Sequence, residues 1–175
     1  MYLTFDDGPH PEVTIKVLQI LKKFDIKATF FCVGDNVRKH PETYQEILDH
    51  GHKTGNHTFH HLNGWKVGAS KYMEDVALCS EYVSGELFRP PYGRLSFSQM
   101  MKLRKQYKII MWTVLSGDFN KNITSEQCLF NSLNITGQGD IMIFHDSLKA
   151  EKNMLHSLPL FVEECLSRGY RFQLL

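Results

Sequence analysis

The sequence of 175 residues predicts an α/β protein whose parallel sheet curls into a compact, incomplete barrel. Short β-prone runs alternate with stretches of helical apolar spacing, an order typical of parallel strands joined by right-handed crossovers. Two runs, FFCV and IIMW, are apolar on both faces, as expected of strands that are covered on both sides. Seven such units in so short a chain favour the incomplete barrel over an open doubly wound sheet.

Seven runs are expected to form the strands of this sheet. Each is rich in β-branched or aromatic residues and is bounded by polar or turn-forming residues. They are YLTF (2–5), ATFFCV (28–33), HKTGNHT (52–58), ELFR (86–89), KIIMWTV (108–114), DIMIFH (140–145) and YRFQLL (170–175).

Six helices are expected between these strands. In the first, Val17 and Leu21 fall on one apolar face. Gly51 is a suitable residue to end the second helix, and Pro159 predicts a kink or a late start in the last one. The helices cover residues 12–25, a stretch from about Pro41, and roughly residues 70–83, 96–107, 124–134 and 152–168.

Composition and charge exclude several classes of protein. Hydrophobic residues make up 42% of the chain and charged residues 22%, which is typical of a globular protein. The net charge of +1 provides no field that would attract nucleic acid or anionic lipid. No apolar run is long enough to cross a bilayer. We therefore expect one domain with no nucleic-acid partner and no transmembrane segment, while the oligomeric state stays open.

The four cysteines, Cys32, Cys79, Cys128 and Cys165, are far apart and form no CxxC pair. This spacing argues against a zinc knuckle or a redox motif. Each cysteine falls in an apolar or helical stretch, so buried free thiols are favoured over a disulfide. No signal peptide precedes the first strand, but Met1 is only one residue ahead of it, so this absence leaves the compartment open.

Ionisable residues follow five of the predicted strands. They lie at Asp6-Asp7, 57–61, 89–94, 116–119 and 145–147. The carboxyl ends of parallel strands meet at one rim, where the active sites of such folds lie. A solvated surface would not sort its charges by strand polarity, so the sequence predicts a catalytic site at this rim.

The residue types at this rim indicate metal-assisted acid–base chemistry. His57 and His61 are four apart, a spacing that brings two imidazoles to one side of a helical turn. Two imidazoles and one carboxylate leave a position open on a zinc ion, as in catalytic sites. Either Asp6 or Asp7 supplies that carboxylate, and the other is then free to accept a proton from water.

Three further residues complete this chemistry. Arg89 can hold the base in place and keep it ionised, and His145 remains as an acid for a leaving group. Asp118 is available to orient the ring of His145.

Taken singly, each residue also has a simpler interpretation. A polar turn suits Asp6-Asp7 and Asp118, and a surface ion pair suits Arg89. Their joint order along the chain favours the site. His60 is expected to be a neighbour of the ligands, and Trp65 either stacks on a sugar or, as we expect, closes a loop over the core.

The motifs TFDDGP, HTFHH, RPPYGR, SGDF and IFHD, in this order, resemble the polysaccharide deacetylases, also called the NodB-homology or carbohydrate esterase family 4 group. The resemblance spans nearly the whole chain. It implies a distorted (β/α)7 barrel, with residues 1–175 as a single NodB-like domain. The resemblance also implies a divalent metal ion as the cofactor. Zn²⁺ is expected, and Co²⁺, Ni²⁺ or Mn²⁺ are alternatives.

The resemblance also assigns the first group of residues. Asp6 matches the family's catalytic base, while Asp7, His57 and His61 match its metal ligands. Arg89 matches the arginine that orients the base. Under this assignment, the two aspartates are adjacent because one holds the metal and the other activates water beside it.

The remaining matches concern the oxyanion and the acid. Tyr92 matches the residue whose backbone N–H binds the oxyanion. His145 matches the acid, and Asp118 matches the carboxylate that tunes it.

The chain departs from the family pattern at three positions. Leu115 stands at the first acid of the fourth motif, Phe119 at its tryptophan, and Ile143 at the leucine of the fifth motif. Phe119 and Ile143 still offer an apolar wall for an acetyl methyl group. The loss of the first acid leaves the preferred substrate open.

The resemblance therefore implies a metal-dependent hydrolase that removes N-acetyl groups from peptidoglycan or chitin-like glycans and releases acetate. One alternative is an O-acetyl esterase acting on xylan-like polymers, and another is a non-catalytic carbohydrate-binding relic. The family's usual target suggests the cell envelope or secretion, whereas unpaired thiols and the lack of a leader suggest the cytoplasm.

Overall fold

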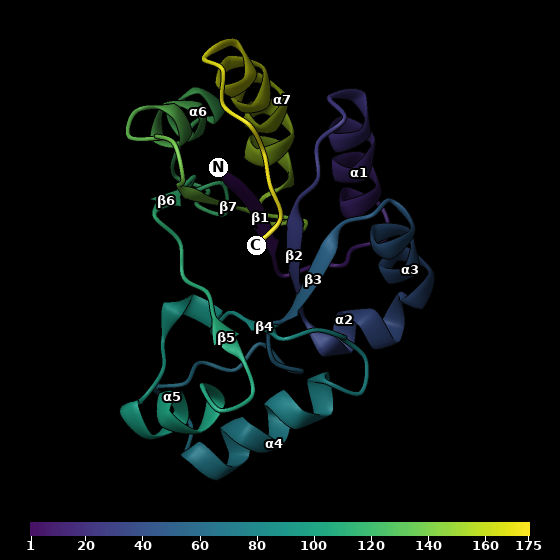
Figure 1. Cartoon of the computed structure of the whole chain (residues 1–175), viewed down its shortest axis with the longest axis vertical. Coiled ribbons are helices and arrows are strands. Elements are labelled where there is room, and N and C mark those ends of the chain that lie inside the picture. Colours follow the sequence, from purple (N-terminus) through teal and green to yellow (C-terminus); the bar gives the residue numbers. More distant parts are fainter.

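The computed structural model describes residues 1–175 and contains one sheet of seven strands. The strands are β1 (Tyr2–Asp6), β2 (Thr29–Cys32), β3 (Lys53–Asn56), β4 (Leu87–Phe88), β5 (Lys108–Ile109), β6 (Val114–Leu115) and β7 (Ile141–His145). Their order is β5-β4-β3-β2-β1-β7-β6, and every pair is parallel. Figure 1 shows that the sheet curls with the helices on its outside. The edge strands β5 and β6 do not pair, so the barrel is incomplete, as predicted.

Seven α-helices and one short 3-10 turn connect the strands. They are α1 (Val13–Lys23), α2 (Gly34–Lys39), α3 (Pro41–Asp49), α4 (Ala69–Cys79), η1 (Pro91–Gly93), α5 (Phe97–Leu103), α6 (Ser125–Leu133) and α7 (Glu151–Ser167). All six predicted helices are present. The sequence did not predict α2, because six residues are too few to show an apolar period. No helix combines the length and the hydropathy that a membrane span requires.

Local sequence signals set several helix ends. Ser96 and Gln99 form a capping box at the start of α5, and Thr124 and Gln127 form another at the start of α6. Gly51 has a φ of +74° just after the end of α3, which agrees with its predicted role. The predicted late start of the last helix is wrong, because α7 begins at Glu151 and includes Pro159.

The run 108–114, predicted as one strand, forms two strands at opposite edges of the sheet. Its first part pairs with β4, and its last part pairs with β7. Between them, the carbonyls of Ile110 and Met111 accept hydrogen bonds from the Arg89 guanidinium, at 3.2 and 3.1 Å. These carbonyls therefore bind a side chain, and the segment 110–113 crosses from one edge to the other (Figure 1).

The predicted strand 170–175 is also wrong. Its residues make only one isolated parallel bridge, between Gln173 and Tyr2. The N-terminal amine of Met1 donates to the carbonyl of Arg171 at 2.7 Å, so the two ends of the chain lie together. The sheet still has seven strands, because residues 108–114 form two strands and residues 170–175 form none.

The main core lies between the sheet and the outer helices. Phe5, Phe30 and Phe144 stand on neighbouring strands, and the ring of Phe5 lies 4.9 Å from Phe30 and 6.3 Å from Phe144. Phe161 of α7 covers Phe144 at 5.8 Å. Side chains alternate along a strand, so residues next to Phe5 and Phe144 face the barrel interior. The four cysteines are buried and unpaired, as predicted.

We expect Phe144→Ala to lower the free energy of unfolding by about 3–5 kcal/mol, because it leaves a cavity in this aromatic cluster. Phe130→Ala is the matched control, since this ring is 63% exposed and its loss should change stability by less than about 0.5 kcal/mol. Equilibrium unfolding in urea, followed by circular dichroism, measures both. Equal losses in the two variants would mean that the core lies elsewhere.

Candidate active site

The predicted residues converge at the carboxyl ends of the strands. Asp6 ends β1 and His145 ends β7, and the two residues are register partners in adjacent strands. His57 follows β3 directly, and Arg89 follows β4. The strand order therefore brings residues from distant parts of the chain to one rim.

Arg89 and Asp6 form a buried ion pair. The Arg89 Nη1 donates to Asp6 Oδ1 at 2.8 Å and to Thr4 Oγ1 at 2.7 Å. Arg89 is fully buried, and its guanidinium lies 4.1 Å from the centre of the Phe31 ring. This geometry fixes the Asp6 carboxylate and leaves Oδ2 free to face the neighbouring imidazole of His57, 3.7 Å away.

Asp7 faces the imidazoles of His57 and His61. Its φ of +78° is in the left-handed region, and its carbonyl accepts a 2.7 Å hydrogen bond from Asn36 Nδ2. Its Oδ1 lies 3.6 Å from His57 Nε2 and 3.0 Å from His61 Nε2. Burial alone would raise the pKa of Asp7. The hydrogen bonds from the two histidines have the opposite and larger combined effect, so the pKa of Asp7 is well below its ordinary value.

The two histidines lie on an irregular loop. The predicted helical turn is wrong, because residues 57–61 form no helix, and Thr58 and His61 have positive φ values of 62° and 54°. The rings of His57 and His61 nevertheless lie 5.1 Å apart. Asp75 of α4 shapes the loop by accepting hydrogen bonds from the backbone N–H groups of Phe59 and His60. The irregular backbone thus brings the two imidazole rings together, as a helical turn was expected to do.

Asp7, His57 and His61 together form a set of donors that suits a metal ion. Their ligand atoms all lie within 4.8 Å of one another. The Nδ1 of His57 bonds to the Arg89 carbonyl oxygen at 2.7 Å, which leaves Nε2 to face Asp7. Two imidazole nitrogens and one carboxylate oxygen fit a divalent ion such as zinc, with a coordination position left open.

His145 and Asp118 form a second buried pair. Asp118 Oδ1 accepts from His145 Nδ1 at 2.8 Å, and Oδ2 accepts from the backbone N–H of His145 at 2.7 Å. Burial lowers the pKa of His145, but Asp118 raises it more, with smaller contributions from Asp7 and Asp6, to about 9. The ring of Phe119 lies edge-on to His145, 5.0 Å away. His145 is therefore held as a cation at neutral pH.

Tyr92 has the backbone geometry expected of an exposed N–H donor. Its φ is 61°, and its ring lies 4.7 Å from the His61 ring. The N–H groups of Gly93 and Arg94 donate to Pro90 and Pro91, whereas that of Tyr92 donates to no acceptor in the protein.

The residues that depart from the family pattern lie near His145. Ile143 is buried two residues before His145 on the same face of β7. Leu115 pairs with Ile143 across the strands and is 39% exposed at the sheet edge. The roles assigned to Phe119 and Ile143 stay predictions.

Asp146 anchors the loop that carries Asp7. It accepts hydrogen bonds from the backbone of Gly8 at 3.1 Å and from the Thr14 hydroxyl. A Cβ atom at position 8 would lie 2.0 Å from an Asp146 carboxylate oxygen, so only glycine fits there. Burial raises the pKa of Asp146 to about 7, although both hydrogen bonds lower it.

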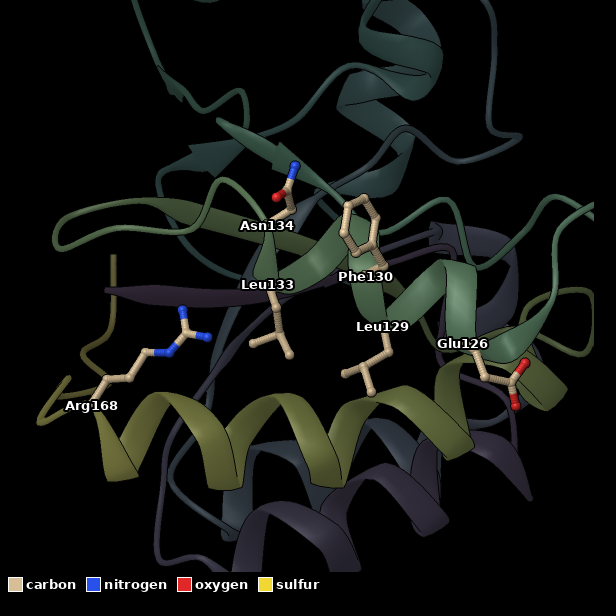
Figure 2. A pocket seen from close by; sticks show the side chains of 6 residues that line it. All are labelled: Glu126, Leu129, Phe130, Leu133, Asn134 and Arg168. Carbon is tan, nitrogen blue, oxygen red and sulfur yellow. The ribbon is translucent and has the colours of Figure 1, made fainter.

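A hollow opens beside the metal-binding set. It is lined by Asp7, Val33, Asp35, Asn36, Phe59, His60, His61 and Ser147. A separate hollow lies between α6 and α7 (Figure 2) and is lined by Glu126, Leu129, Phe130, Leu133, Asn134 and Arg168. The second hollow contains none of the predicted site residues. Of these two hollows, the first adjoins the candidate site.

Three supporting residues were not identified from the sequence. Thr4 binds Arg89, Asn36 binds the backbone of Asp7, and Asp75 holds the histidine loop. Thr4 looks like an ordinary strand residue, and Asp75 lies on a distant helix. Only Asn36 carried a signal, because it follows a predicted strand at the same rim.

Comparisons with known proteins agree with this geometry. The family model described as polysaccharide deacetylase matches residues 1–109. A peptidoglycan-N-acetylglucosamine deacetylase of Bacillus cereus is 31% identical over 178 residues, covering 97% of this chain and 64% of the relative. The chain spans as little as 36% of other curated relatives that it matches.

Solved structures show the same fold. The crystal structure of the Bc1960 peptidoglycan N-acetylglucosamine deacetylase superposes with a TM-score of 0.90 at 28% identity, covering 99% of this chain and 85% of that one. A family 4 acetyl xylan esterase from Clostridium thermocellum, solved with a cobalt ion, gives 0.87 at 27% identity, covering 99% and 86%. The distorted (β/α)7 barrel is thereby confirmed.

We expect Asn36→Ala to weaken zinc binding about tenfold, because Asp7 loses the hydrogen bond that holds its left-handed backbone. Isothermal titration calorimetry with Zn²⁺ measures the affinity. Asn134→Ala, at the hollow between α6 and α7, is the matched control and should bind zinc like the parent. Equal affinities in all three proteins would show that Asn36 does not position Asp7.

Proposed function

Because the chain belongs to the polysaccharide deacetylase family, we propose that it is a metal-dependent hydrolase that removes N-acetyl groups from N-acetylglucosamine-containing glycans. The observation that carries this proposal is the placement of Asp7 Oδ1 within 3.6 Å of the Nε2 atoms of both imidazoles. The products are acetate and a free amino sugar.

Asp7, His57 and His61 would hold the divalent ion. When bound, such an ion supplies a Lewis acid that makes water more acidic and stabilises negative charge on a carbonyl oxygen. We propose zinc, because the donors are two imidazoles and one carboxylate. The esterase of similar fold that was solved with a cobalt ion supports a metal-dependent reaction.

Asp6 would act as the general base. Arg89 fixes the orientation of the Asp6 carboxylate through Oδ1, which leaves Oδ2 as the proton acceptor. Water that loses a proton to Asp6 attacks the acetyl carbonyl carbon.

His145 and Tyr92 would complete the reaction. The Tyr92 N–H stabilises the oxyanion, an effect typically worth about 3–4 kcal/mol per donor. His145, held as a cation by Asp118, gives its proton to the nitrogen as the C–N bond breaks. Phe119 and Ile143 would enclose the acetyl methyl group.

Peptidoglycan is the favoured substrate class. The relative from Bacillus cereus is named as a peptidoglycan deacetylase. A peptidoglycan substrate would place the activity of this protein at the cell envelope. The esterase of similar fold keeps O-deacetylation as the rival reaction. An alkoxide leaves more easily than an amine, so that rival depends less on His145. Acetate release from chitooligosaccharide and from acetylated xylan separates the two.

We expect Asp6→Asn and His145→Ala each to lower the rate of acetate release at least 100-fold, because each removes one proton-transfer group. Acetate is measured by a coupled enzymatic assay with proteins of equal zinc content. Asn134→Ala should retain the parent rate. Parent-like rates in both folded, metal-loaded variants would exclude the proposed mechanism.

The activity should also fall at alkaline pH with an apparent pKa of about 9. His145 must carry its proton to act as the acid, and that proton is lost as the pH rises through this value. Asp118→Asn removes the charge that raises the pKa, so the alkaline limb should move to lower pH. The pH profile of kcat tests this, and an unmoved limb would show that Asp118 does not tune His145.

A further inference from the structure

Trp65 is an exposed aromatic residue that the proposed reaction does not use. Its side chain is 67% exposed and belongs to neither core cluster, so the expectation that it closes a loop over the core is wrong. Its Nε1–H donates to the carbonyl of Leu95 at 3.0 Å. One edge of the indole is thereby fixed, while most of the ring stays open to solvent.

Arg94 lies over this ring and has no acidic partner. Its Cζ is 4.9 Å from the centre of the Trp65 ring. The lysine and arginine ion pairs of the protein all involve other cations, namely Lys16, Arg38, Lys39, Arg89, Lys108 and Arg168. Arg94 therefore presents an exposed guanidinium whose hydrogen-bond donors are free for a carboxylate.

The loops that carry Trp65 and Arg94 are tied together beneath the surface. Gln99 is buried, and its Nε2 donates to the carbonyls of Gly64 at 2.9 Å and Val67 at 3.2 Å. A Cβ atom at Gly64 would lie 2.4 Å from the Arg94 carbonyl oxygen, so the two loops are in close contact. The pair is held in place before any ligand arrives, which reduces the entropy lost on binding.

This pair lies close to the candidate active site. Trp65 is four residues beyond His61, a span of at most about 14 Å. Arg94 is two residues beyond Tyr92, and the Tyr92 ring lies 4.7 Å from the His61 ring. Both loops follow strands of the sheet at their carboxyl ends. A glycan with an acetyl group at His61 can therefore extend over Trp65.

We propose that Trp65 and Arg94 form a subsite for a sugar residue that carries a carboxylate, on the same glycan as the acetyl group that is removed. This inference rests on the proposed function. The apolar face of a pyranose stacks on the indole, and the guanidinium pairs with the carboxylate. Peptidoglycan strands from which the stem peptide has been removed carry such a carboxylate on the lactyl group of N-acetylmuramic acid, whereas chitin has none. The subsite thus selects acidic over neutral acetylated glycans.

The test is glycan binding in the Asp6→Asn background, which prevents turnover. Isothermal titration calorimetry compares a peptide-free peptidoglycan tetrasaccharide, whose lactyl carboxylates are free, with the neutral chitin tetrasaccharide. Arg94→Gln should weaken binding of the acidic glycan about tenfold and change the neutral one less than about twofold. Trp65→Ala should weaken both, and Arg94→Lys should restore part of the acidic preference.

Arg104→Gln and Phe130→Ala are the matched controls, since both side chains are exposed on other elements. Both controls should bind like the background. Equal loss of both glycans in Arg94→Gln, or no loss of either, would overturn the inference. Binding does not depend on acetate release, so an inactive parent that keeps this pattern would refute the proposed function alone.

Discussion

The burial of Arg89 is the constraint on which the site depends. A charge without exposure to water needs partners, and removal of one partner of such a pair typically costs about 3–5 kcal/mol. The guanidinium binds Asp6 and Thr4 of β1 and the carbonyls of the segment between β5 and β6. The carbonyl of the same residue fixes the ring of His57. One residue thus positions both the base and a metal ligand, and it also ties the segment between the two edge strands to β1.

This constraint explains how two adjacent carboxylates serve different purposes. Asp6 continues the strand and faces Arg89, whereas the left-handed backbone of Asp7 turns its side chain toward His57 and His61. Arg89 pairs with Asp6, and the two imidazoles face Asp7, so the repulsion between the carboxylates is offset. Asn36 and Asp146 hold the turn from either side, through the Asp7 carbonyl and the Gly8 amide. These hydrogen bonds hold the turn without any contribution from an ion.

Much of this arrangement was predictable from the sequence, because strand polarity sorts the ionisable residues onto one rim. The parts that were not predictable depend on contacts between distant residues. Residues 108–114 look like one buried strand, and only the contacts of Arg89 show why they divide. The spacing of His57 and His61 suggested a helix, whereas Asp75, fourteen residues beyond His61, sets a loop instead. The local sequence pattern predicts which residues form the site, whereas long-range hydrogen bonds determine the backbone conformation that holds them.

Anomalous X-ray diffraction from crystals grown with Zn²⁺ would test the metal centre most directly. We expect one strong peak at about 2.0–2.2 Å from an Asp7 carboxylate oxygen and from the Nε2 atoms of His57 and His61. At least one coordination position should be open to solvent, next to Asp6. A peak at other residues, or an ion enclosed by four protein ligands, would contradict a hydrolytic centre in this protein.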